Sequence, residues 1–202
     1  MPVETLFLLI AIAAGTVWTP GPNNAMLASS GATFGFRRTM PHLFGVALGF
    51  PMMVFAMALG LGEVFRQYPL LGEVLRWIGA ALLLWFAWRT FNARPPGEGA
   101  SRSRPFTFLE AAAFQWVNPK AWIMAISVIS QFVTGQALVL EAAICAGVYA
   151  VCGLTSASGW AGFGAALKRF LSTPSRLQMF NAVMALLIVA SIAMLLRSDL
   201  SL

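Results

Sequence analysis

The chain has 202 residues, of which 59% are hydrophobic and 10% are charged, and its mean hydropathy is +0.78. A soluble domain carries about 25% charged residues, so this composition excludes an ordinary soluble protein and predicts an all-α integral membrane protein. The net charge of +6 does not indicate a nucleic-acid partner, because the basic residues stand in short loops between apolar runs.

In chain order, the apolar runs predict six membrane-spanning helices, at about residues 5–30, 40–61, 70–91, 106–132, 138–167 and 179–196. Six spans of roughly 20 residues use up the length, so residues 1–202 form a single domain. A segment rich in Pro, Gly, Ser and Arg, residues 92–105, links a first half, 1–91, to a second half, 106–202. Glu4 and the lack of Lys or Arg before the first run argue against a cleaved signal peptide.

The first expected span is interrupted by the sequence Trp18-Thr19-Pro20-Gly21-Pro22-Asn23-Asn24. Each proline lacks a backbone N–H and clashes with the preceding turn, and glycine adds backbone freedom, so a helix stops here. Hydrocarbon cannot satisfy the freed backbone groups or the two amides, which must therefore face protein or water. An interrupted, polar point at mid-membrane depth is typical of a solute site in a transporter.

The fourth expected span carries a second interruption, Gln115-Trp116-Val117-Asn118-Pro119-Lys120. It aligns with the first when one residue is inserted, so that Trp-Thr-Pro matches Trp-Val-Asn-Pro. Because each half has three spans, an odd number, the halves would be inserted in opposite directions. The two interruptions therefore predict a 3+3 inverted repeat in which helices one and four are broken. A single proline kink without a site beside it would be the simpler interpretation of either interruption alone.

A new helix can begin at each interruption. Asn118 is a good N-cap, and Pro119 then takes the first helical position, where its missing N–H costs nothing. Gly21 and Pro22 can do the same in the first span. Both helices would direct their free N–H groups and positive dipole ends to mid-membrane, which suits an amino-acid carboxylate, while Asn23 and Asn24 offer donors and acceptors to the solute.

Lys120 is the only charge expected deep within a span. It can bind the solute carboxylate or release a proton to couple transport, or it can extend to water along a tilted helix. Glu110 is a candidate proton relay, although an interfacial acid at a helix N-terminus is the favoured interpretation. His42, the only histidine, is a candidate proton sensor, with an interfacial role favoured. Trp18 and Trp116 either cover the solute or pack.

The remaining polar and small residues predict no chemistry. Gly45 and Gly49 lie one turn apart and either admit a neighbouring backbone or occur together by chance. Small residues in spans two and five would allow a homodimer or serve internal packing. Cys145 and Cys152 are expected to be core residues that do not bridge. With no catalytic Ser/His/Asp set, phosphate loop or metal cluster, we expect no cofactor, no metal and no enzymatic activity.

The basic residues also predict an orientation. Nine lie in or beside the first, third and fifth loops, namely Arg37, Arg38, Arg89, Arg94, Arg102, Arg104, Lys168, Arg169 and Arg176. Only three, Arg66, Arg76 and Arg197, lie in the other loops and the C-terminal segment. Because cytoplasmic loops are enriched in Lys and Arg, the odd loops are expected in the cytoplasm and both termini outside it.

Two motifs resemble those of the LysE/RhtB family of amino-acid exporters. The family's N-terminal signature is similar to Pro20-Gly21-Pro22-Asn23-Asn24 with Gly31, Gly35, Phe36-Arg37-Arg38, Gly45 and Gly49, and its second-half motif is similar to Asn118-Pro119-Lys120-Ala121. The resemblance extends over essentially the whole chain. It implies a multi-pass exporter of amino acids or close derivatives in the bacterial inner membrane, driven by proton antiport or the membrane potential.

One departure from part of this family bears on the solute. Its lysine and arginine exporters tend to carry Gly-Pro-Gln-Asn in the first span and acids within the second and fourth. Here residues 45–51 contain no acid, and Met124 follows the second motif. We therefore expect neutral solutes such as homoserine, threonine or branched-chain amino acids. The alternatives are a basic amino-acid or small-metabolite exporter, a membrane enzyme or redox carrier, and a non-transporting structural membrane protein.

Overall fold

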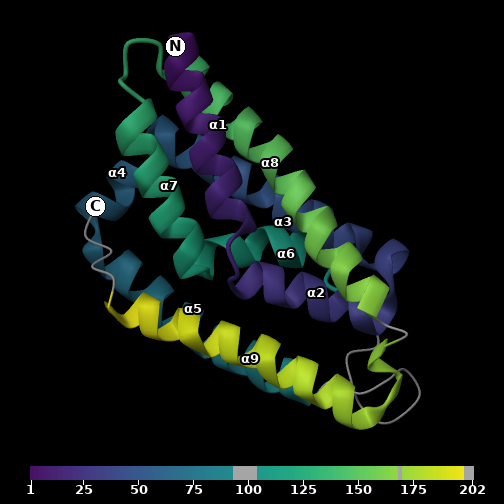
Figure 1. Cartoon of the computed structure of the whole chain (residues 1–202). Coiled ribbons are helices and arrows are strands. Elements are labelled where there is room, and N and C mark those ends of the chain that lie inside the picture. The colour runs from purple at the N-terminus through teal and green to yellow at the C-terminus, as the bar shows by residue number, and fades with distance from the viewer. Residues whose placement is uncertain (93–103, 168–169, 198–202) are drawn as a thin grey trace.

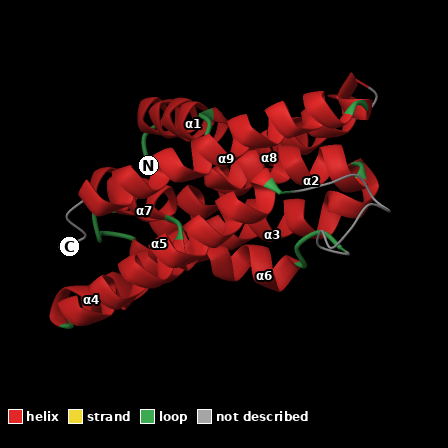
Figure 2. Ribbon diagram, turned by 90° about the horizontal axis from the view of Figure 1, so that it is seen from below, coloured by secondary structure: helices red, strands yellow, loops and turns green. Residues whose placement is uncertain are grey.

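The computed structural model describes residues 1–92, 104–167 and 170–197, and these residues form helices joined by short turns, with no strand among them (Figures 1 and 2). The elements, in chain order, are α1 Val3–Trp18, α2 Pro22–Phe34, α3 Phe36–Ala56, η1 Met57–Leu61, α4 Gly62–Gln67, α5 Pro69–Phe91, α6 Phe108–Phe114, η2 Gln115–Val117, α7 Pro119–Phe132, α8 Leu138–Leu167, η3 Phe170–Ser172 and α9 Pro174–Arg197.

Five of the six expected spans have the length and composition to cross a membrane. Four are helices, Phe36–Phe65, Leu70–Phe91, Leu138–Leu167 and Ser175–Ala193, and the fifth is the bent pair α1 and α2. The expected fourth span, residues 106–132, is divided into the 7-residue α6, the turn η2 and the 14-residue α7, none of which is long enough alone. The helical class is confirmed, and the first and fourth expected spans both differ from an uninterrupted membrane helix.

Both expected helix breaks are present. The axes of α1 and α2 meet at 56° across residues 19–21, where Thr19 and Gly21 are extended. Asn118 is likewise extended between η2 and α7. The residue before a proline is pushed out of the helical region by the proline ring, which explains the conformations of Gly21 and Asn118. Each following proline then occupies the first position of the next helix.

The helices pack in pairs around the two breaks. The long helices α3 and α8 lie against each other, α6 packs on α3, and α1 packs on α8. Helices α5 and α9 form a separate pair, which runs along the lower edge of the molecule in Figure 1. Helix α2 lies between α8 and this pair, and it contacts both α8 and α9. Since α2 is covered on almost every side, eleven of its thirteen residues are buried.

Small residues make the closest helix contacts possible. A methyl group on Gly49 of α3 would lie 2.6 Å from the Cα atom of Ala112 in α6, so the Gly45/Gly49 pair admits a neighbouring backbone. Between α2 and α8, a methyl group on Gly164 would collide with the carbonyl oxygen of Ala28. These glycines in spans two and five therefore serve contacts within one chain.

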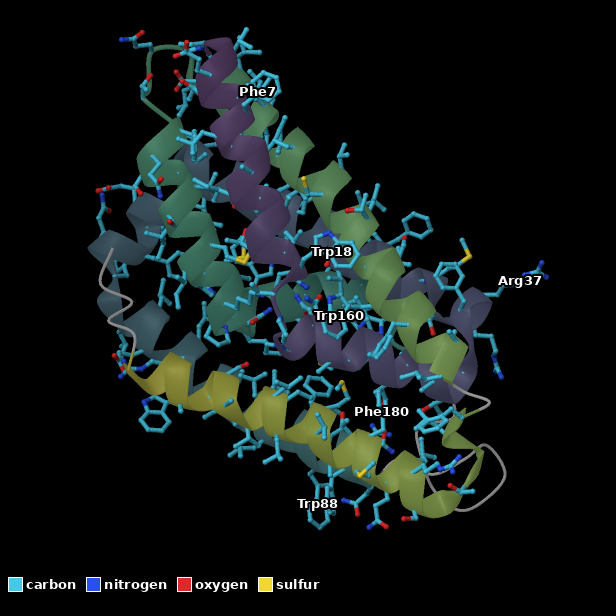
Figure 3. All side chains as sticks on the ribbon, in the orientation of Figure 1. Phe7, Trp18, Arg37, Trp88, Trp160 and Phe180 are labelled. Carbon is cyan, nitrogen blue, oxygen red and sulfur yellow. The ribbon has the colours of Figure 1, made fainter. Side chains whose placement is uncertain are left out.

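The ends of the elements are sorted to two sides of the molecule. Helices α2, α5 and α8 end, and α9 begins, at the lower right of Figure 1, whereas the N-terminus and the turn between α7 and α8 lie at the top. Arg37 projects from the right-hand side of the molecule in Figure 3. The segments flanking the first, third and fifth loops thus share one end, while most of the linker 92–105 and Lys168 and Arg169 lie outside the described residues.

Candidate functional site

A cavity lies where the two breaks meet. It has a volume of about 510 Å³, including the part open to solvent, and is lined by residues of α1, α2, α3, η2, α7 and α8. Its polar wall contains the predicted residues Gly21, Asn23, Asn24, Asn118 and Lys120, together with Gln115. Two segments about a hundred residues apart in sequence therefore form one site.

Lys120 connects the two breaks. Its ammonium Nζ donates hydrogen bonds to the backbone carbonyl and to the Oγ1 of Thr19, each 2.6 Å long. Its stem crosses the face of Gly21, where a methyl group would come within 2.9 Å of the Lys120 Cδ. A larger residue at position 21 would therefore require the Lys120 side chain to shift. The ammonium also sits favourably at the negative dipole end of α1.

Asn24 and Ser156 donate hydrogen bonds to the free carbonyl groups at the C-terminal end of α1. The Asn24 Nδ2 donates to the carbonyls of Val17 and Thr19, both at 2.9 Å, and the Ser156 Oγ donates to the Val17 carbonyl at 2.7 Å. The last carbonyls of a helix have no partners within it, and here α2 and α8 provide them. Asn24 lines the cavity as predicted, but its amide nitrogen is used to hold the break.

Asn23 faces Gln115 across the cavity wall. The Asn23 Nδ2 donates to the Gln115 Oε1 at 2.9 Å, and the Gln115 Nε2 donates back at 3.5 Å and to the Ala111 carbonyl at 2.9 Å. Gln115 is completely buried. Sequence reasoning missed it as a site residue, although a glutamine beginning the second polar motif in an apolar span was a usable signal.

The starts of α2 and α7 both border the cavity. Helix α2 begins after Gly21 without a side-chain cap, so the N–H groups of its first turn are available to an anion. In α7 the buried Asn118 is the N-cap, and its Oδ1 accepts from the Lys120 N–H at 3.2 Å. The site therefore combines one uncapped helix start with a nearby ammonium group, an arrangement suited to a carboxylate.

The apolar wall of the cavity is formed by residues of α3, α7 and α8. The sequence did not single these residues out for binding. Phe50 and Tyr149 pack edge to face at 5.1 Å between ring centroids, and Met124 lies nearby in the lining. The Tyr149 hydroxyl is 3.5 Å from the Thr16 Oγ1, and its side chain is buried. A tyrosine in a run of small residues has no distinctive sequence motif, so its place in the site depended on the helix packing.

Both tryptophans of the two motifs pack outside the cavity. The Trp18 ring lies against Gly159 of α8, at the lower end of α1 in Figure 3. Trp116 packs edge to face with Trp122, and its carbonyl accepts from the Trp122 Nε1 at 2.8 Å. Neither tryptophan lines the cavity, and both pack against other parts of the chain. The three prolines that shape the breaks, Pro20, Pro22 and Pro119, do not line the cavity either.

The other coupling candidates, Glu110 and His42, also lie outside the cavity. Glu110 forms a capping box with Thr107 at the start of α6 and accepts two hydrogen bonds from Arg104, at 2.8 and 3.0 Å. This hydrogen bonding and the Glu110 charge raise the pKa of the Arg104 guanidinium. His42 is buried against Phe106, with 4.9 Å between ring centroids. Glu110 therefore lies at a helix N-terminus and caps it, which agrees with its interpretation as an acid placed at a helix start.

Several membrane-length helices and a polar cavity between two helix breaks define the class of multi-span solute translocators. The chain belongs to the LysE type translocator family, whose profile matches residues 14–199, and the family resemblance is thereby confirmed. It is similar to the cysteine/O-acetylserine efflux proteins of Escherichia coli (strain K12) and Shigella sonnei (strain Ss046), each 32% identical over 178 residues, which cover 86% of this chain and 88% of the relative. No solved structure gives a significant match.

Proposed function

We propose that this protein exports small neutral amino acids, or close derivatives of them, across the bacterial inner membrane. The observation that carries the proposal is the meeting of the α2 start, Lys120 and the Asn23–Gln115 pair in one cavity. The names of its relatives specify cysteine and O-acetylserine, which are small amino acids without a charged side chain. Their chemistry agrees with the neutral class expected from the sequence.

The cavity offers a partner to each part of such a solute. The carboxylate binds between the uncapped first turn of α2 and the Lys120 ammonium. The amino group donates to the amide oxygens of Asn23 and Gln115. The side chain lies against Phe50 and Met124. Among the described lining residues there is no carboxylate, so a cationic side chain would lack a counter-charge, which favours neutral over basic solutes.

Alternating access follows from the pairing of the helices. If the second half repeats the first, α1 corresponds to α6, α3 to α8 and α5 to α9. The observed contact α3–α6 in one half then corresponds to the contact α8–α1 in the other. The repeat exchanges α3 with α8 and α5 with α9, so it maps each of these two contacting pairs onto itself. These pairings are the ones a 3+3 inverted repeat would produce, although α2 packs on α8 much more closely than α7 packs on α3. The orientation, with the odd loops in the cytoplasm and both termini outside, rests on the distribution of Lys and Arg among the loops. The two halves rock about the cavity to expose it to either side.

Lys120 provides the moving contact of this cycle. Without solute, its ammonium holds the end of α1 through Thr19. When a carboxylate arrives, it replaces these oxygens as the acceptor, which frees the break in span one and lets the halves move. Export is driven by the membrane potential or by a proton that leaves and returns to this ammonium. Glu110 and His42 have no part in this scheme.

An efflux assay tests the proposal. Cells producing the protein should release preloaded neutral amino acids and resist toxic amounts of them. Pro22→Ala and Asn23→Ala should lose this release at unchanged membrane abundance, because one alters the start of α2 and the other removes a solute partner. Gln131→Ala, a change of an exposed amide at the far end of α7, should release solute normally. A correctly inserted protein that exports no amino acid would refute the proposal.

A further inference from the structure

A second and larger cavity lies between α2 and α5. Its volume is about 1100 Å³, including its open mouth. Helix α2 lines it with Met26, Ser29, Ser30 and Thr33, and α5 contributes aromatic and polar residues near its C-terminal end. The cavity is at the end of the molecule where α2 and α5 both end (Figure 1). None of the residues predicted to bind the solute lines it.

One face of α2 connects the two cavities. Asn23, Met26, Ser30 and Thr33 are spaced three, four and three residues apart, which places them on one side of the helix. Asn23 lines the first cavity, and the other three line the second. With a rise of about 1.5 Å per residue, Asn23 and Ser30 are only about 10 Å apart along the axis. The short helix thus presents one face to both cavities, polar at Asn23, Ser30 and Thr33 and apolar at Met26.

Packed side chains lie between the two cavities. Phe114 packs edge to face on Phe86 of α5 at 5.2 Å between centroids, and both belong to one buried cluster with Met26. The next residue after Phe114 is Gln115, which is hydrogen-bonded to Asn23. The barrier therefore includes two aromatic rings, one amide pair and a methionine. Met26 is the most easily repacked of these side chains, because methionine changes rotamer readily.

We propose that the second cavity is a water-filled inlet through which the solute reaches the first cavity from the cytoplasmic side. This inference rests on the proposed function. The lining supports water and a zwitterion over a lipid chain, because an acyl chain would bring no hydrogen-bond partner to the hydroxyls of Ser29 and Thr33, whereas the Ser30 Oγ already lies 3.2 Å from the Thr39 Oγ1. Arg89, held over the Trp85 ring at 4.9 Å, adds a positive charge at the mouth, which attracts the solute carboxylate.

Cysteine labelling tests the inlet. In a parent with Cys145→Ala and Cys152→Ala, Ser30→Cys and, independently, Thr33→Cys are treated with a charged, membrane-impermeant thiol reagent. The reagent is applied to inside-out vesicles and, separately, to intact cells. We expect labelling of both from the cytoplasmic face only, and a loss of export after labelling because the adduct fills the path. The control Leu84→Cys, on an exposed position of α5, should remain unlabelled and active.

The outcomes separate the inlet from the proposed function. If the wild-type protein exports an amino acid but the cysteine-free parent does not, the loss is caused by the two alanine changes. The labelling is then repeated in a parent with Cys145→Ser and Cys152→Ser. If neither parent nor wild type exports, the proposed function fails and the inlet as a solute route fails with it. If the parent exports, any one of three results overturns the inlet: no labelling at either introduced cysteine, labelling only from outside, or labelling that leaves export unchanged.

Discussion

Replacing Lys120 with methionine removes the ammonium group while keeping an unbranched side chain at the start of α7. In the structure that group makes two hydrogen bonds of 2.6 Å to Thr19, and in the proposed cycle it passes to the solute carboxylate. A hydrogen bond to a charged group contributes about 1.5–3 kcal/mol. Since 1.4 kcal/mol is a factor of ten, the variant should export about 10- to 150-fold more slowly at low solute concentration.

The assay is release of preloaded amino acid from cells, normalised to the amount of protein in the membrane. Thr19→Val is the matched control, because it removes one acceptor of the Lys120 ammonium and leaves the carbonyl and the charge in place. It should reduce export much less than Lys120→Met. Two results would refute the reasoning: normal export by Lys120→Met, or a fall in export that only parallels a fall in abundance. The second would show that Lys120 merely braces the two breaks.

Four further predictions concern packing, capping, the amide pair and topology. Gly164→Val should destabilise the protein by about 1–3 kcal/mol or more, seen as a lower thermal midpoint, because the side chain meets the Ala28 carbonyl. Glu110→Ala should cost about 0.5–2 kcal/mol through loss of the capping box, with export per molecule retained. Alanine changes at Asn23 and Gln115, alone and combined, should show a coupling of about 0.5–3 kcal/mol in the apparent affinity for the exported solute. A C-terminal reporter that is active only in the cytoplasm should stay silent.

Each of these has a contrary outcome. Gly147→Ala, with no atom within 4 Å of the added methyl group, is the control for Gly164→Val, and equal midpoints would contradict the close contact of α2 and α8. Loss of export by Glu110→Ala at full abundance would restore its role as a proton relay. Strict additivity at Asn23 and Gln115 would show that their hydrogen bonds do not matter for transport. A bright cytoplasmic reporter would reverse the orientation.

The sequence determined the positions of the two breaks, because proline and the residue before it restrict their own backbone whatever the rest of the chain does. Pro22 and Pro119 both start helices where expected. Composition likewise determined the membrane class, and the motifs identified the family. The fourth span was the least well predicted, since α6 is short and hydropathy alone gave no sign of how far the break divides it.

Only the tertiary structure decided which residues of the two motifs face the cavity. Asn23 and Asn24 are adjacent in sequence, yet one pairs with Gln115 and the other holds the end of α1. The helix crossings determine this division, and they depend on where glycines let backbones approach, as at Gly49 and Ala112. Contacts between residues about a hundred positions apart are not encoded in either local segment, because they arise from the packing of whole helices.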